Sequence, residues 1–404
     1  MNSSEMQKKN RMLVFRTLLE NGSMTRTALA AGVGLQKATI TNIINEFLDL
    51  GIIGIDGDAA AGRRGENICL ILDGIYIMSM DITRKDFQIG IFSLYGEQVK
   101  HIGYRFEKNE DLYSVFDKLK RNALELMNEF GKKKIIGVCM AVPGPFIRKI
   151  EDGSELFQVS EFEELNNINL RRELEETLGM PMVIKHDAKL SAYAEWRNAE
   201  EVKANEKVSL IIIRSRGYGI GAGIVINGKI VEGQLGIAGE VGHIGINYNG
   251  RRFENEHSGT FEYCAGTESA VRYMQERLFE FPDSMLNEKS TYQDIVEAYQ
   301  RHDPLAVWAI EKMAWMLGYG IANIIYMINP DCIILGPDYP NDESFVEVVR
   351  KTVRQFVSPY VGKCVSIRYS RLEEDSFLLG GYYYILEKLC NGESIIEKIE
   401  QAKN

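Results

Sequence analysis

Short polar side chains gather on one face of a helix that the sequence predicts over residues 36–50. Apolar residues at helical spacing, Ile40, Ile43 and Phe47 among them, form the opposite face, which we expect to be buried. Amide, ammonium and hydroxyl groups on short side chains can bond to the edges of DNA bases and to phosphates. Two arginines further along could reach a phosphate or the minor groove. The candidate DNA-binding residues are therefore Gln36, Lys37, Thr39, Thr41, Asn42, Arg63 and Arg64.

The segments around this helix are typical of a small DNA-binding fold. Apolar spacing predicts a first helix over 8–21, and Thr25 can cap a second helix over 26–31. Glycines at 32 and 34 favour a tight turn before the third helix. Residues 52–55 and 67–72 then read as a hairpin whose tip carries the arginine pair. Together they predict a winged helix-turn-helix; the alternative is a helical cap that only packs on the rest of the chain.

Length and composition place the chain among globular proteins with several domains. It has 404 residues, a formal net charge of −10, 45% hydrophobic and 26% charged residues, which excludes a disordered or fibrous chain. Residues 1–72 carry a net charge of about +1, so the acidity lies in the remainder. The six scattered cysteines, the polar first residues and the absence of an apolar run of ~18 residues predict a cytoplasmic protein without disulfides or membrane spans.

The rest of the chain repeats one pattern of strands and helices. Strands are expected at 75–82, 87–94, 99–106 and 135–142, with a helix over 111–130. A comparable set begins at 208–214 and includes a long helix over 304–328 and a strand over 332–335. The predicted fold class is therefore α/β, with two lobes of βββαβ type and a ligand cleft between them, as in actin-like sugar kinases.

Several motifs make the sequence similar to the ROK family (repressors, open reading frames, sugar kinases), in the branch with an N-terminal winged helix-turn-helix. The most specific runs over residues 217–247 and ends in AGEVGHIGIN; others are GVCMAVPGP at 137–145, HDAKLSAYAEW at 186–196 and NPDCIILG at 329–336. The resemblance implies three parts: a DNA-binding domain over 1–72, a first lobe over 73–186 completed by a C-terminal helix at about 375–404, and a second lobe over 187–374.

The resemblance also implies a sugar site. In the family, an Asn-Asp pair, a Glu-x-x-His motif and a following Glu bind the sugar through carboxylates and an imidazole. The Asp is the general base in the kinases. Here His replaces the Asn, which changes the donor geometry. The positions that match are His186, Asp187, Glu240, His243 and Glu262.

The nucleotide motifs depart from the family pattern. The first phosphate turn, Asp-x-Gly-Gly-Thr in the kinases, here has Thr83 and Arg84 in place of the glycines. Tyr218 interrupts the second turn, and Pro337 removes an amide near the adenosine position. We therefore expect no kinase activity and no cofactor; the alternative is that Arg84 and Lys85 bind phosphate by charge. The zinc-binding cysteines of many family members are replaced by Phe253, Asn255 and Thr260, so no metal is expected.

These features predict a sugar-responsive transcriptional regulator, a repressor of carbohydrate-utilisation genes similar to xylose-responsive or N-acetylglucosamine-responsive repressors. It would bind double-stranded operator DNA as a homodimer or tetramer and a sugar in the interlobe cleft. The main alternative is an ATP-dependent sugar kinase with a DNA-binding head. A third is a regulator controlled by a protein partner instead of a sugar.

Overall fold

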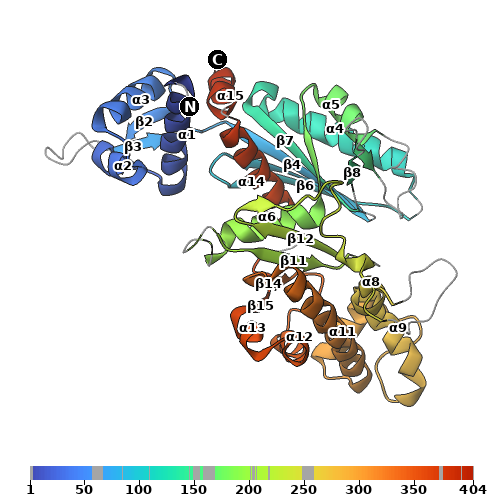
Figure 1. Cartoon of the computed structure of the whole chain (residues 1–404). Helices are drawn as coiled ribbons and strands as arrows, with labels where there is room; N and C mark the ends of the chain where they lie inside the picture. The colour runs from blue at the N-terminus through green and yellow to red at the C-terminus, as the bar shows by residue number, and fades with distance from the viewer. Residues whose placement is uncertain are drawn as a thin grey trace. The chain divides into compact units, whose positions relative to one another are not determined.

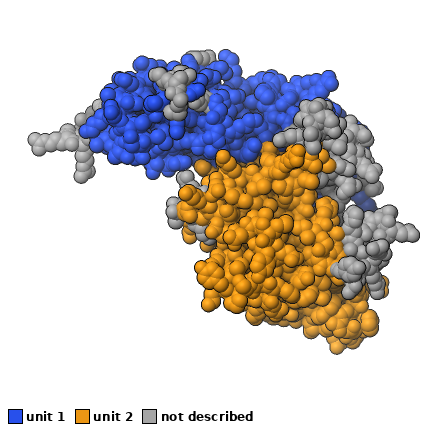
Figure 2. All heavy atoms as spheres, in the orientation of Figure 1, with its two compact units in different colours: residues 1–142, 167–184, 381–404 blue, residues 143–166, 185–380 orange. Residues whose placement is uncertain are grey.

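The computed structural model describes residues 3–56, 67–83, 85–108, 110–144, 146–148, 155–157, 169–200, 202, 205, 207–216, 219–247, 259–372, 376–392 and 394–403. They form two compact units, shown in Figure 2. Unit 1 comprises Met1–Val142, Asn167–Ile184 and Gly381–Asn404, and unit 2 comprises Pro143–Asn166 and Lys185–Gly380. The domain limits expected from the sequence remain a prediction.

The first helices of unit 1 pack around a small apolar core. They are α1 (Ser3–Asn21), α2 (Arg26–Val33) and α3 (Lys37–Asp49). Strands β2 (Ile53–Asp56) and β3 (Asn67–Leu70) pair antiparallel, and β3 also pairs with the two-residue strand β1 (Met24–Thr25), which the sequence pattern did not predict (Figure 1). Phe15 is fully buried, whereas Leu13 is 39% exposed.

The rest of unit 1 is built on a five-stranded sheet with the order β10-β7-β4-β5-β6 (Figure 1). Its strands are β4 (Tyr76–Ile82), β5 (Asp86–Ser93), β6 (Gln98–Arg105), β7 (Ile135–Val142) and β10 (Val183–His186). The accompanying helices are α4 (Leu112–Phe130), the short η1 (Lys132–Lys134) and α5 (Leu170–Leu178). Helix α14 (Ser376–Asn391) from Gly381 onward and helix α15 (Ser394–Lys403) also belong to this unit. Lys403 Nζ donates to the carbonyl of Ile71 at 2.8 Å.

Unit 2 repeats the pattern with the strand order β13-β12-β11-β14-β15. These strands are β11 (Leu210–Arg214), β12 (Gly221–Ile226), β13 (Lys229–Ile230), β14 (Cys332–Leu335) and β15 (Ser366–Tyr369). A separate pair is β8 (Phe146–Arg148) and β9 (Glu155–Phe157). The helices are α6 (Asp187–Asn198), η3 (Val241–His243), α8 (Phe261–Ala265), α9 (Thr267–Arg277), η4 (Leu278–Glu280), α10 (Tyr292–Gln300), α11 (Pro304–Ile328), α12 (Glu343–Phe356) and α13 (Pro359–Cys364).

The two faces of the second sheet carry different helices because side chains alternate along a strand. Ile211 and Ile213 of β11 belong to the apolar core that includes Leu317 and Ile321 of the long helix α11. On the other face, α6 approaches β12 so closely that a Cβ built on Gly223 would lie 2.0 Å from the carbonyl oxygen of Ala188. The sequence thus places α6, which begins at Asp187, directly on the sheet.

Candidate functional site

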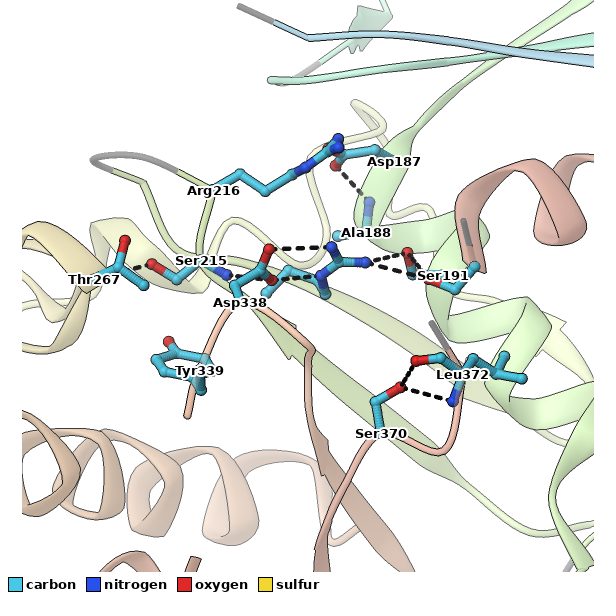
Figure 3. Close-up of polar contacts among 12 residues, drawn as sticks. Asp187, Ala188, Ser191, Ser215, Arg216, Thr267, Asp338, Tyr339, Ser370 and Leu372 are labelled. Carbon is cyan, nitrogen blue, oxygen red and sulfur yellow. Dashed lines mark hydrogen bonds and ion pairs between the residues drawn. The ribbon is translucent and has the colours of Figure 1, made fainter. Parts of the chain in front are cut away.

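Asp187 and His186 lie where strand β10 ends and helix α6 begins. His186 is the N-cap residue, and its Nδ1 accepts a hydrogen bond from the Ala188 amide at 3.1 Å. The same amide donates to Asp187 Oδ1 at 2.5 Å. Asp187 is only 8% exposed, and Figure 3 shows it beside Arg216. The start of the helix therefore fixes both side chains, and an anion there is favoured by the free amides and the helix dipole.

Positive charge keeps Asp187 ionised despite its burial. Arg216 Nη1 lies 3.2 Å from Asp187 Oδ2. Burial raises the pKa of Asp187, but the charges of His186, Arg216 and Arg214 outweigh burial and hold that pKa below its ordinary value. At neutral pH the carboxylate can therefore accept hydrogen bonds, for example from hydroxyl groups of a ligand.

The other three predicted sugar residues also lie in unit 2. His186 Nε2 is 3.6 Å from Glu240 Oε1. Glu240 directly precedes η3, at whose end His243 Nδ1 lies 3.4 Å from Glu262 Oε1. The structure thus joins His186, Asp187 and Glu240 into one group and pairs His243 with Glu262. No finding tests whether these five residues bind a sugar, so that role stays a prediction.

Glycines between these two groups allow the close approach. A Cβ on Gly242 would lie 2.4 Å from the Ile220 carbonyl oxygen and 2.7 Å from Glu262 Oε2. A Cβ on Gly221 would lie 3.3 Å from the His186 ring. The glycine-rich segment therefore brings backbone and polar side chains together where a larger residue would not fit.

Sequence reasoning missed Arg214, whose side chain fills the space beside Gly336. Arg214 is 5% exposed. Its guanidinium forms a bidentate pair with the Asp338 carboxylate, with Nε at 2.5 Å from Oδ2 and Nη2 at 3.1 Å from Oδ1. Its Nη1 donates to Ser191 Oγ at 2.9 Å. A Cβ on Gly336 would lie only 2.4 Å from Arg214 Cδ. The one available signal was the pair of arginines two residues apart at the end of β11.

A buried lysine anchors the loop that leads to Glu240. Lys189 of α6 is 3% exposed, and its Nζ donates to the carbonyl of Gly236 at 2.5 Å and to Glu232 Oε2 at 3.3 Å. Glu232 Oε1 accepts a second bond from Lys185 at 2.7 Å. Burial lowers the pKa of Lys189, and the neighbouring carboxylates only partly oppose this effect. The α6 helix thus positions both Asp187 and this loop.

The first predicted phosphate turn lies in unit 1, and two of its amides donate hydrogen bonds to a side chain of the same turn. Thr83 Oγ1 accepts hydrogen bonds from the amides of Lys85 and Asp86, both at 3.0 Å, and donates to Asp86 Oδ1 at 2.6 Å. Amides of this kind are what a phosphate-binding turn offers to its ligand. Arg84, Gly217 and Tyr218, on which the same expectation depended, lie outside the described residues.

The predicted DNA-binding face is partly described. Gln36 precedes α3 as its N-cap residue and makes no side-chain capping bond. Gln36, Lys37 and Asn42 are exposed, while Thr39 and Thr41 are half-buried. Thr41 Oγ1 donates to the carbonyl of Lys37 at 2.9 Å, so its proton is used within the helix. Arg63 and Arg64 lie outside the described residues.

No metal site or membrane span is found in the part of the chain that the structure describes. No three His, Cys, Asp or Glu residues there are placed to hold a metal ion. Phe253 and Asn255, from which the absence of zinc was expected, lie outside it. None of the helices described is long and apolar enough to cross a membrane.

Comparison with known proteins identifies the family. A sequence model described as the ROK family matches residues 77–388. The chain belongs to the ROK family. A xylose repressor of Caldicellulosiruptor bescii is 26% identical over 400 residues, which cover 94% of this chain and 96% of the repressor. This ROK protein therefore resembles a curated repressor along almost its whole length, and the predicted family is confirmed.

Solved structures confirm the α/β fold class. A ROK family transcriptional regulator, described as a homologue of the Escherichia coli MLC protein, superposes with a TM-score of 0.80 at 24% identity and covers 98% of this chain and 99% of its own. The ROK hexokinase from Thermus thermophilus superposes with a TM-score of 0.61 at 21% identity. It covers 78% of this chain and 100% of its own.

Proposed function

We propose that this ROK protein is a transcriptional repressor that binds operator DNA through its N-terminal helices and leaves it when a sugar binds. The observation that carries the proposal is the extent of the structural matches. The match to the hexokinase covers all of that enzyme but only 78% of this chain. The match to the regulator covers 98% of this chain. The ROK match begins at residue 77, so the additional part is the N-terminal segment with α1, α2 and α3.

The third helix supplies the DNA-binding chemistry of the proposal. Ile40, Ile44 and Phe47 hold α3 in the core of the segment. Lys37 and Asn42 are exposed, and Thr39 and Thr41 are half-buried. A second helix of a helix-turn-helix binds in the major groove with the residues of its first turns. Gln36, Lys37, Thr39, Thr41 and Asn42 would then contact bases and phosphates, and Arg63 and Arg64 the flanking backbone.

The charges around Asp187 favour a neutral sugar. Asp187 is paired with Arg216, whereas Glu240 and Glu262 lie beside the imidazoles of His186 and His243. The hydroxyl groups of a neutral pyranose can donate to all three carboxylates, whereas the carboxylate of an acidic sugar would be repelled by them. Because the C. bescii relative is named a xylose repressor, D-xylose is the first sugar to test.

The proposal excludes phosphoryl transfer from ATP. Arg214, which is paired with Asp338, fills the space beside Gly336, at the position that corresponds to adenosine binding in the family. The amides of Lys85 and Asp86 are bound by Thr83 instead of being open to a phosphate.

The test uses the full chain and duplexes selected from a random pool by binding to it. Fluorescence anisotropy then measures operator affinity with and without saturating D-xylose, D-glucose or N-acetylglucosamine. Coupling of typical strength lowers affinity by about 5–150-fold. Asp187→Ala should keep sugar-free operator binding and lose the response. An unchanged affinity with every sugar contradicts the inducer part of the proposal.

A sugar kinase is the second candidate function, because the hexokinase shares the fold and the chain keeps Asp187 at the family's general-base position. An assay that couples ADP release to NADH oxidation, run over hexoses, pentoses and amino sugars, separates the two. The matched control is Asp187→Asn. Turnover above that control would establish the kinase, whereas equal rates support the repressor.

A further inference from the structure

Helix α14 has polar contacts at both of its ends. The division between the two compact units falls within this helix, between Gly380 and Gly381. Its first residues therefore belong to unit 2, which holds Asp187, and its later residues to unit 1, which holds the DNA-binding helices.

The first turn of α14 contacts two arginines of the candidate sugar site. The Arg216 guanidinium lies over the Phe377 ring, 4.5 Å from its centroid, while its Nη1 is 3.2 Å from Asp187 Oδ2. Arg214 Nη1 donates to Ser376 Oγ at 3.2 Å. Phe377 is fully buried, so it cannot turn away without repacking. One guanidinium thus touches both the predicted sugar acceptor and the start of α14.

The last turns of α14 hold the first helix of the DNA-binding segment. Arg16 of α1 forms a two-pronged pair with Glu387, with N–O distances of 3.0 and 3.1 Å. Arg16 also donates to Asn391 Oδ1 at 2.9 Å. Glu387 and Asn391 are four residues apart and therefore share one face of the helix. A bidentate pair fixes direction as well as distance, so a movement of α14 would also move α1.

We propose that Arg216 senses the sugar and that α14 carries its response to α1 and so to the DNA-binding helix; this inference rests on the proposed function. A sugar hydroxyl that donates to Asp187 competes with Arg216 for the carboxylate. The guanidinium then shifts over Phe377 and displaces the first turn of α14. Because the helix is continuous to Asn391, the displacement reaches Glu387 and Arg16.

The first experiment needs neither sugar nor DNA. Amide hydrogen exchange of the full chain is measured in Phe377→Leu, which keeps the Arg216–Asp187 pair, and in Arg216→Met, which removes both contacts and does not depend on a buried substitution. Lys388→Gln, an exposed change on the same helix, is the control. We expect exchange in α1 to rise at least threefold in the first two variants and to stay unchanged in the control.

A double substitution makes this test specific. Positions 377 and 387 are ten residues, about 15 Å, apart along the helix, so independent effects on exchange in α1 should multiply. If α14 transmits the change, Phe377→Leu will have no further effect in a Glu387→Gln background. The proposal is overturned if exchange in α1 is unaffected by Phe377→Leu and Arg216→Met, or if the effects multiply.

The second experiment tests the link to function with D-xylose and the selected operator. The affinity of Glu387→Gln for xylose should lie within twofold of that of the unsubstituted chain. The factor by which xylose lowers its operator affinity should be at least fivefold smaller. A full response in Glu387→Gln overturns the proposal. If sugars leave the operator affinity unchanged but the exchange coupling is observed, the proposed function is refuted. The coupling of Arg216 to α1 is then still supported.

Discussion

The charge state of single residues decides what the candidate site can do. Asp187 corresponds by sequence to the general base of the family's kinases, and the charges of His186, Arg216 and Arg214 hold its pKa below the ordinary value. The same charges suit a carboxylate that only accepts hydrogen bonds. Arg216 is the cation that pairs with this carboxylate directly, with Nη1 at 3.2 Å from Oδ2.

Removal of Arg216 should change the dependence of stability on pH. A carboxylate with a lowered pKa stabilises the fold above its ordinary value, about 3.9, and this stability is lost as the pH falls through the lowered value. Arg216→Met should therefore cost about 1–2 kcal/mol at pH 7, since the pair is partly buried. Melting temperatures measured from pH 7 to pH 3 should converge below about pH 4. In an Asp187→Asn background the loss of stability caused by Arg216→Met should no longer depend on pH. If Arg216→Met alone costs the same stability at every pH, the lowered pKa of Asp187 is contradicted.

Gln36 gives a second prediction for a single residue. It leaves the first amides of α3 without a side-chain cap. Gln36→Asp should stabilise the helix by about 1 kcal/mol, as a better cap, and yet weaken operator binding because its charge repels a phosphate. Gln36→Ser, a neutral cap, should give a similar rise in melting temperature with a smaller loss of affinity. Tighter DNA binding by the Asp variant would argue against contact between this end of α3 and DNA.

At the scale of elements, the position of α6 depends on a glycine in β12. Gly223 faces Ala188 and Ala192, and a Cβ there would lie 2.0 Å from a backbone oxygen that cannot move by itself. The whole helix would have to shift, together with Asp187, Lys189 and Ser191. Packing between α6 and the sheet thus sets the geometry of the site.

Gly223→Ala should accordingly affect stability and sugar binding together. We expect a loss of about 1–3 kcal/mol from overpacking and at least a tenfold loss of sugar affinity. Gly245→Ala, at an exposed glycine with no atom within 4 Å of its built Cβ, serves as the control and should change neither. Denaturant unfolding and sugar titration measure the two effects. A variant that is destabilised but binds sugar normally would show that α6 can shift without moving Asp187.

Local patterns explain how far the sequence could predict this structure. The helix Pro304–Ile328 and the strand Cys332–Leu335 have the predicted limits, because Pro, Asn and long apolar runs mark their ends. Strand β1 was missed because two residues carry no periodicity. The pairing of Arg214 with Asp338 spans 124 positions, and no local pattern encodes it. Family motifs located the five candidate sugar residues, but not the arginine beside Asp187.

At the scale of the whole molecule, operator recognition should require two chains. Two-fold symmetric binding places recognition helices ~34 Å apart, or a multiple of this, on one side of the duplex. We expect two chains per operator in sedimentation experiments. Insertion of about five base pairs between the half-sites turns one to the opposite side and should lower affinity at least tenfold. Equal affinity for one half-site and for the full operator would contradict a homodimer on DNA.

Arg214 has a consequence for the physiology of a repressor built in this way. Its guanidinium and Asp338 satisfy each other inside the chain, beside the position that corresponds to adenosine binding in the family. If the proposed function holds, operator affinity should respond to the sugar and not to ATP.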